Sequence, residues 1–319
     1  AGVKRQTVYG STAAIRVERT GRSVLFAQRG RKKIRELFFD FADTDGFIAR
    51  DLTVLSEHVT AAGITDIAFQ QDPDNILWMV RDDGELLGFT FQREQEVFAW
   101  HRHVIGGSFG TGKAVVESVA VIPEGDTDEL WLIVKRTINS ATKRYVERLD
   151  TQFDERTALV DAFFVDSGLS YDGAATNTFT GLDHLDGESL AVLADGSIRT
   201  NVTPVAGSVT IDGPAAVKAH IGLYRNADLF TLPAETAQTI ATTRGRVKRM
   251  EKVHILFWRT VGALVGPSVS KLDRIPWRDP LDPMDAPPPL FTGVKNALVD
   301  SAHGQDVQVY LRQDQPLPC

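Results

Sequence analysis

An apolar stretch built around one aromatic residue recurs three times in the first half of the chain, and this repeat constrains the fold more than any other feature. The aromatic residues are Phe26, Trp78 and Trp131, which lie 52 and 53 residues apart. Each stretch is followed by a polar turn and a second apolar run, and a further strand-like segment precedes the second and third copies. The pattern predicts repeated units of three or four short antiparallel strands, with the three aromatic residues in equivalent buried positions.

A unit of about 50 residues made of antiparallel strands has the size of a β-propeller blade. Propellers typically need four to eight blades to close, so three copies indicate either an open arc or further blades before residue 1, and we favour further blades. The alternative is a set of unrelated hairpins that resemble one another by coincidence. The second apolar runs span residues 34–41, 85–91 and 143–149, and the preceding segments span 65–69 and 117–121.

Turn residues favour strands over helices along most of the chain. Asp-Gly dipeptides tolerate the positive φ angles of tight hairpin turns, and they begin at positions 45, 83, 172, 186, 195 and 212. Residues 51–62 are the exception, because three apolar residues at helical spacing predict a short helix there, with Asp51 as its cap and Gly63 after its end. The three residues are Leu52, Leu55 and Val59.

The repeat stops near Asp161, where a segment rich in small and turn residues is typical of a passage between domains. We therefore predict a mainly β protein with two domains. Residues 1–165 are expected to form a partial β-propeller-like array of antiparallel blades. Residues 166–319 alternate apolar and polar residues, which predicts a β-sandwich or a small barrel with one buried face per sheet.

Six prolines between Pro276 and Pro289 exclude a strand or a helix and predict an extended surface loop. The loop also carries the apolar residues Trp277, Leu281 and Met284. A stiff, extended segment with apolar anchors is suited to contact a neighbouring subunit. The alternative is that the loop folds back over its own domain.

The composition is that of an ordinary globular protein, with 43% hydrophobic and 24% charged residues. The net charge of −7 argues against a dedicated nucleic-acid binder. The only cysteine, Cys319, excludes an intramolecular disulfide and a cysteine-ligated zinc site. The chain begins with neither a methionine nor a signal peptide, so we expect it to be part of a longer protein.

The glycine-rich segment 106–114 matches two functional motifs in part. Residues 107–113 read as the start of a phosphate-binding loop, and residues 106–110 as a hydrolase nucleophile elbow. Both motifs need a helix directly afterwards, whereas the β-branched residues that follow Ala114 predict a strand. We interpret the segment as a connection between blades in which Ser108 and Lys113 have no catalytic role.

Two further groups of residues resemble a metal site and a pair of catalytic acids, but each has a simpler structural explanation. His101 and His103 would share one face of a strand, yet two ligands are too few for a metal site, so we favour an exposed polar face. Asp82, Asp83 and Glu85 suggest the paired acids of a glycosidase, but an Asp-Gly turn explains them. We therefore predict a protein that is not an enzyme, and assign no catalytic, cofactor-binding or metal-binding residue.

Two basic runs stand out, but aromatic residues that stack on bases do not alternate with them. We interpret both runs as solvated faces. The alternative is contact with the backbone of a nucleic acid, which would require the two runs to converge on one surface. The runs are Arg29, Arg31, Lys32, Lys33 and Arg35, and then Arg244, Arg246, Lys248, Arg249 and Lys252.

Sequence segments along nearly the whole chain resemble one protein family. The segments are residues 35–37, 51–53, 67–73, 75–86, 90–103, 181–188, 193–196, 220–223, 290–293 and 313–318. They resemble the tail nozzle or tail stabilisation proteins of short-tailed (podovirus-type) bacteriophages and prophages. Where that family reads Gly-Leu-Pro-Tyr, this chain reads Gly-Leu-Tyr-Arg at 222–225.

The resemblance implies a non-catalytic structural component of a bacteriophage tail, a nozzle or tube ring that lines the DNA exit path. It implies a ring of six copies, contacts between these copies and with neighbouring tail proteins, no cofactor, no membrane, and DNA that passes without sequence-specific binding. The protein would be made in the host cytoplasm and reside in the virion tail. The alternative is a propeller-type carbohydrate-binding or glycoside-hydrolysing protein, which should show two carboxylates about 5–10 Å apart in a concave pocket.

Overall fold

The computed structural model describes residues 8–41, 46–235 and 243–319. Strands account for 52% and helix for 3% of the structure, so the prediction of a mainly β protein is confirmed. The helical residues form three single 3₁₀ turns, η1 (Arg93–Gln95), η2 (Leu159–Asp161) and η3 (Asp183–Leu185). Across the three described ranges, no helix is long and apolar enough to span a membrane.

The chain divides into two compact units, Ala1–Thr151 and Gln152–Cys319. The division lies earlier than the boundary near residue 165 that the sequence suggested. Phe153, Leu159 and Phe164 pack against the hydrophobic core of the second unit. The segment rich in turn residues is therefore attached to the second unit by its own apolar side chains.

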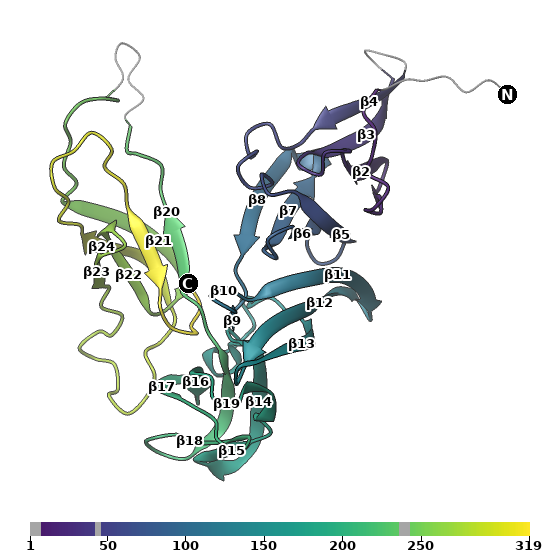
Figure 1. Ribbon diagram of the computed structural model, residues 1–319. Helices are drawn as coiled ribbons and strands as arrows, with labels where there is room; N and C mark the ends of the chain where they lie inside the picture. Colours follow the sequence, from purple (N-terminus) through teal and green to yellow (C-terminus); the bar gives the residue numbers. More distant parts are fainter. Residues whose placement is uncertain (1–7, 42–45, 236–242) are drawn as a thin grey trace. The chain divides into compact units, whose positions relative to one another are not determined.

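Within the described residues, the first unit contains three antiparallel sheets of three or four strands that follow one another along the chain (Figure 1), and a small hairpin of β9 (Ser108–Phe109) and β10 (Gly112–Lys113). In each sheet, strands that are neighbours in sequence are also neighbours in space. The first sheet is β1 (Glu18–Thr20), β2 (Ser23–Ala27), β3 (Ile34–Asp40) and β4 (Gly46–Asp51). The second is β5 (Ile64–Gln70), β6 (Ile76–Arg81), β7 (Leu86–Gln92) and β8 (Val97–His103), and the third is β11 (Val115–Glu124), β12 (Thr127–Ile138) and β13 (Ala141–Arg148).

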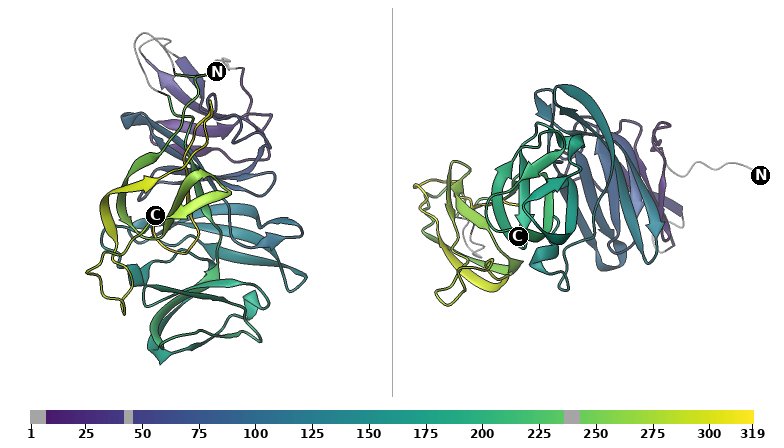
Figure 2. Two further views of the ribbon diagram at one scale, coloured as in Figure 1. Left: turned by 90° about the vertical axis from the view of Figure 1, so that its left-hand side faces the viewer. Right: turned by 90° about the horizontal axis from the view of Figure 1, so that it is seen from below.

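The second sheet is buried on both faces, between the first and third sheets. Successive side chains of a strand point to opposite faces, so alternate side chains of β6 pack in two different hydrophobic cores. Leu77 and Met79 pack in a cluster with residues of the first sheet, whereas Trp78 and Val80 pack with residues of the third sheet. The right-hand view of Figure 2 shows the sheets of this unit as successive layers.

The three repeated aromatic residues lie on corresponding strands, the second strand of each sheet. Trp78 and Trp131 also match in register, because each pairs with an alanine of the preceding strand, Ala68 or Ala120. The prediction that all three occupy equivalent buried positions is wrong in two respects. Trp131 is only half-buried, and Phe26 points to the opposite face.

The position of Phe26 follows from its two neighbours in β2. Leu25 and Ala27 pack with the second sheet, so Phe26 points away from it. Trp78, by contrast, points toward the sheet that follows its own. A shift of one residue in a strand moves a side chain to the other face, and an alignment of apolar runs does not detect that shift.

The predicted helix at residues 51–62 is also wrong, because this segment forms consecutive turns held by three backbone hydrogen bonds of the i to i+3 type. Asp51 acts as a turn cap, since its carboxylate accepts from the backbone N–H and the Oγ1–H of Thr53 at 2.9 and 2.5 Å. Leu52 and Val59 pack on the core, but Leu55 is 93% exposed. The segment therefore lacks the continuous buried stripe that stabilises a short helix.

Most of the Asp-Gly turns lie where the sequence predicts them. Asp83 and Gly84 connect β6 to β7, and Asp195 and Gly196 connect two strands of the second unit with φ angles of 48° and 75°. The dipeptide at 172 instead lies inside a strand, next to a register shift. The aspartate of the dipeptide at position 45 lies outside the described residues.

The second unit contains two four-stranded sheets and two pairs of strands, all antiparallel. One sheet has the order β14-β19-β16-β17, the other has the order β20-β25-β22-β23, and the pairs are β15 with β18 and β21 with β24. The strands are β14 (Asp166–Thr176), β15 (Thr178–Thr180), β16 (Leu190–Ala194), β17 (Ser197–Val202), β18 (Ser208–Thr210), β19 (Ala216–Leu223), β20 (Ala227–Phe230), β21 (Lys252–Thr260), β22 (Ala263–Ser268), β23 (Lys271–Arg274), β24 (Phe291–Leu298) and β25 (Tyr310–Gln313).

Candidate functional site: a charged cluster and exposed apolar faces

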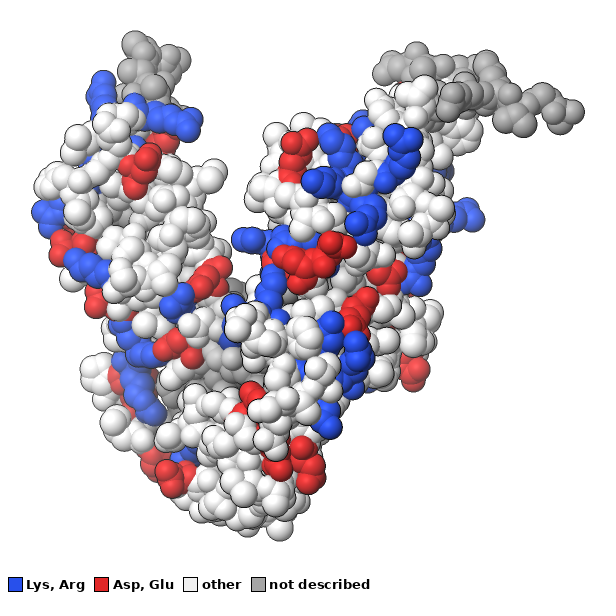
Figure 3. All heavy atoms as spheres, viewed as in Figure 1, with Lys and Arg blue, Asp and Glu red and all other residues white. Residues whose placement is uncertain are grey.

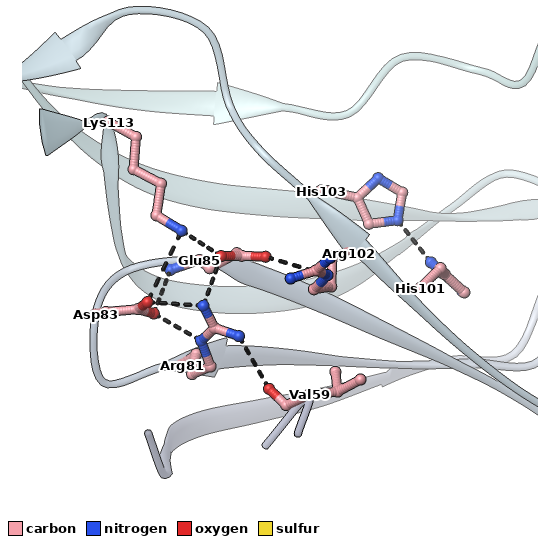
Figure 4. Close-up of polar contacts among 8 residues, drawn as sticks. All are labelled: Val59, Arg81, Asp83, Glu85, His101, Arg102, His103 and Lys113. Atoms are coloured by element: carbon pink, nitrogen blue, oxygen red, sulfur yellow. Dashed lines mark hydrogen bonds and ion pairs between the residues drawn. The ribbon is translucent and has the colours of Figure 1, made fainter. Parts of the chain in front are cut away.

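Charged side chains converge at the turn between β6 and β7 (Figure 4). The guanidinium of Arg81 donates to Glu85 at 2.6 Å and to both carboxylate oxygens of Asp83 at 2.7 and 2.8 Å. Lys113 also donates to Glu85, and Arg102 lies 3.8 Å from the other oxygen of this carboxylate. Because Glu85 is only 5% exposed, these three cations offset the cost of burying its charge.

The cluster contains two of the three acids that suggested a glycosidase, Asp83 and Glu85, whereas Asp82 lies 3.4 Å from Arg31. Hydrogen bonds from Arg81 lower the pKa of Asp83 to about 2. A general acid needs the opposite shift, a pKa raised toward neutrality. Asp83 and Glu85 therefore form a structural ion-pair network in which both carboxylates already have cationic partners.

The glycine-rich segment forms a small hairpin of β9 (Ser108–Phe109) and β10 (Gly112–Lys113). Strand β11 begins at Val115, where both functional motifs would need a helix. Lys113 has partners that the sequence did not identify, because its ammonium pairs with Glu85 and lies 3.8 Å from Asp83. Lys113 thus links the hairpin to the second sheet.

The two histidines of β8 are half-buried against Trp78, which faces the third sheet, rather than lying on an exposed polar face. Nδ1 of His101 and Nε2 of His103 are 2.6 Å apart and share a hydrogen bond, and both rings pack against Trp78. Burial lowers the pKa of both imidazoles, that of His103 to about 4. Within the described ranges, no group of three or more His, Cys, Asp or Glu side chains is placed to hold a metal ion.

Carboxylates neutralise part of each basic run. In the first unit Lys33 pairs with Asp51 and Glu57 at 2.9 and 3.1 Å, and in the second Arg249 pairs with Asp300 at 3.1 Å. Figure 3 shows acidic and basic side chains interspersed on the viewed face. This distribution is that of solvated, paired surface charge rather than of a single-sign track for a nucleic acid.

The outward face of the third sheet, the face turned away from the second sheet, exposes apolar side chains. Ile133 and Val146 pair across β12 and β13 and are 39% and 68% exposed, beside the half-buried Trp131. Ion pairs border them on both sides, Glu129 with Arg148 and Glu117 with Lys135 and Arg144. An apolar centre with a charged rim has the composition of a contact surface.

The outward face of the first sheet, turned away from the second sheet, carries an aromatic cluster. Phe39, Phe41 and Phe47 are 44%, 84% and 46% exposed. The ring of Phe39 lies 5.7 Å from that of Phe41 and 5.3 Å from that of Phe47. Large aromatic residues grouped on a surface mark a site of interaction with another molecule.

A third apolar surface lies on the two-stranded ribbon of β21 and β24 in the second unit. Leu256 and Val294 face each other across the ribbon and are 76% and 58% exposed. Trp258 and Leu298 extend the same surface, with 56% and 74% of their areas exposed. The alternate residue Phe257 is buried in the core of the unit, so the ribbon is apolar on both faces.

The proline-rich loop has one buried anchor and an exposed tip. Trp277 is 7% exposed and packs against Phe257 in the core of its own unit. This contact supports the alternative in which the loop folds back over its own domain. Leu281 and Met284 are 97% and 84% exposed, as a contact loop requires. Arg278 holds the tip together by donating to two carbonyl groups of the loop at 2.6 Å.

Comparison of the chain with protein-family models found no match. A search of curated proteins also found no match.

The structure identifies surfaces that sequence reasoning did not single out, above all the three phenylalanines of the first sheet and the ribbon of the second unit. Their sequence signal was present, since Phe39, Phe41, Leu256 and Trp258 alternate with residues that face a core, but alternation alone does not tell which face is buried.

Proposed function

We propose that the chain is a non-catalytic structural component of a bacteriophage tail, in which it contributes to a nozzle or tube ring around the DNA exit path. The sequence resemblance to tail nozzle proteins suggests this role. The observation that carries it is the set of exposed apolar faces on the first sheet, the third sheet and the ribbon. A monomeric soluble protein rarely exposes several contiguous apolar surfaces, whereas a subunit that packs against copies and neighbours requires them.

In this proposal the three sheets of the first unit are propeller-like blades, and the second unit is a β-sandwich-like domain. Sequential antiparallel strand order and face-to-face packing support the first assignment. The partners are other copies in a ring and neighbouring tail proteins. DNA would pass without sequence-specific contacts, and the protein would reside in the virion tail.

The alternative, a carbohydrate-binding or glycoside-hydrolysing protein, has less support. Its candidate acids, Asp83 and Glu85, are both bound to Arg81, and the depressed pKa of Asp83 is the reverse of what proton donation needs.

Mass spectrometry of purified particles from the strain that encodes this chain tests the proposal. We expect peptides of this protein in the tail fraction, at several copies per particle, and no binding of the purified protein to host-surface glycans. Absence from the particle together with glycan binding or cleavage would overturn the proposal and favour the alternative.

A further inference from the structure

The packing of one sheet on the next occurs twice in the first unit, and the contact between the second and third sheets uses the second strand of the second sheet, β6. Trp78 and Val80 of β6 point toward the following sheet. The register of the alanine pairs places Trp131 and Ile133 of β12 at the same positions of the third sheet. The outward face of the third sheet therefore repeats, along its central strand, the side chains with which the second sheet binds its successor.

The first sheet presents the other half of such a contact. The second sheet binds its predecessor through large apolar residues, among them Leu77 and Phe89. On the outward face of the first sheet, the corresponding strands carry Phe26, Leu37 and Phe39. Phe26 is buried and Leu37 is half-buried, whereas Phe39, together with its neighbours in the aromatic cluster, remains exposed.

The chemistry of the two outward faces is complementary. Arg144 and Arg148 border the third-sheet face, and their side chains are 57% and 48% exposed. Guanidinium groups bind aromatic faces. The packing of the first sheet on the second already uses this contact, since the guanidinium of Arg93, which follows β7, lies 3.8 Å from the ring centre of Phe38 in β3.

We propose that the three sheets form an open arc, in which the outward face of the third sheet of one copy binds the outward face of the first sheet of a second copy. The inference rests on the proposed structural role and names the surfaces that serve it. Because the two faces differ, the contact is heterologous, and successive copies form a closed ring or a filament.

Two variants and their mixture test this contact by analytical ultracentrifugation. Val146→Asp places a charge in the outward apolar face of the third sheet, and Phe47→Asp places one in the outward face of the first sheet. Each charge should prevent binding through the face that carries it. Both side chains are partly exposed, so each variant should retain the circular dichroism spectrum of the parent chain. We expect the parent chain to self-associate with rising concentration, and each variant alone to bind itself at least tenfold more weakly.

The mixture is the decisive sample. Each variant keeps the face that the other lacks, so equal amounts should form a dimer of one copy of each and nothing larger. Leu256→Asp, which places the same charge on the ribbon of the second unit, should leave self-association unchanged.

A parent chain that stays monomeric at all concentrations would overturn the inference, as would variants whose mixture fails to pair or a loss of association in Leu256→Asp. These outcomes are separate from the test of the proposed function. A chain that is present in the tail but monomeric in solution would retain the structural role and lose this particular contact.

Discussion

The two units are both antiparallel β structures, but they join their strands in different ways. In the first unit each sheet is a run of consecutive strands, as where Ile138 of β12 pairs with Ala141 of β13 across a tight turn. In the second unit Ala227 of β20 pairs with Gln313 at the end of the chain. Local pairing leaves a repeat in the sequence, whereas distant pairing does not. Closing a long loop costs more conformational entropy than closing a short one, so strand pairing costs more entropy in the second unit than in the first.

The largest effect is expected where a side chain fills the space between two sheets. Trp78→Ala should lower the free energy of unfolding of the first unit by about 3–5 kcal/mol, because Trp78 is 3% exposed and donates to Gln70 at 2.8 Å. Trp131→Ala is the matched control and should cost roughly 1 kcal/mol, since one side of its ring faces solvent. Chemical denaturation measures both, and equal losses would contradict the open outward face of the third sheet.

The same substitution in the second unit sharpens the comparison between units. Trp277→Ala should cost about 3–5 kcal/mol, because the ring lies in the core of that unit, 5.0 Å from Phe257. We expect it to shift the unfolding transition of the second unit and to leave that of the first unchanged. A single shared transition that moves in both variants would show that the two units unfold as one.

Acidification should weaken the first unit through its buried histidine. Burial lowers the pKa of His103 to about 4 from an ordinary value of 6.5, so between these values the unfolded chain binds a proton that the folded chain does not. The free energy of unfolding should therefore fall as pH drops from 6.5 to 4, by at most about 3 kcal/mol. His103→Gln should flatten this dependence, and an unchanged slope in the variant would assign the pH effect to other groups.

Two glycines, one in each unit, lie where an added Cβ would clash with a neighbouring group. A Cβ added to Gly88 would lie 2.0 Å from Cε1 of His101, and one added to Gly266 would lie 1.8 Å from the carbonyl oxygen of Lys271. A side chain can rotate away, but a paired backbone carbonyl cannot. Gly88→Ala should therefore cost about 1 kcal/mol and Gly266→Ala about 3 kcal/mol, and Gly30→Ala, with open space around it, is the control. A reversed order would contradict the assignment of these contacts.

The smallest effect is expected at the tip of the proline-rich loop. Leu281→Ser and Met284→Ser should change the stability of the second unit by less than about 0.5 kcal/mol, because both side chains are exposed. In a tail assembly assay, loss of incorporation without loss of stability would identify the tip as a contact. Substantial destabilisation would instead show that the tip covers its own unit.

Sequence reasoning identified the strands of the first unit because their apolar runs and turns repeat. It did not place Phe26 on the correct face, since the direction of a side chain depends on a one-residue shift that similar apolar runs conceal. It predicted a helix at Leu55, where spacing was suitable but the residue is exposed. The ion pairs of Glu85 with Arg81 and Lys113 were not predictable, because tertiary packing brings Lys113 to the turn.

Electron cryomicroscopy of the tail, at a resolution that shows side chains, tests the central claim most directly. We predict several copies of this chain in a ring around the DNA path, with the outward faces of the first and third sheets buried between subunits and Val146 shielded from solvent. Particles whose tails lack the chain, or copies in which these faces, the ribbon and the loop tip all stay exposed to solvent, would contradict it.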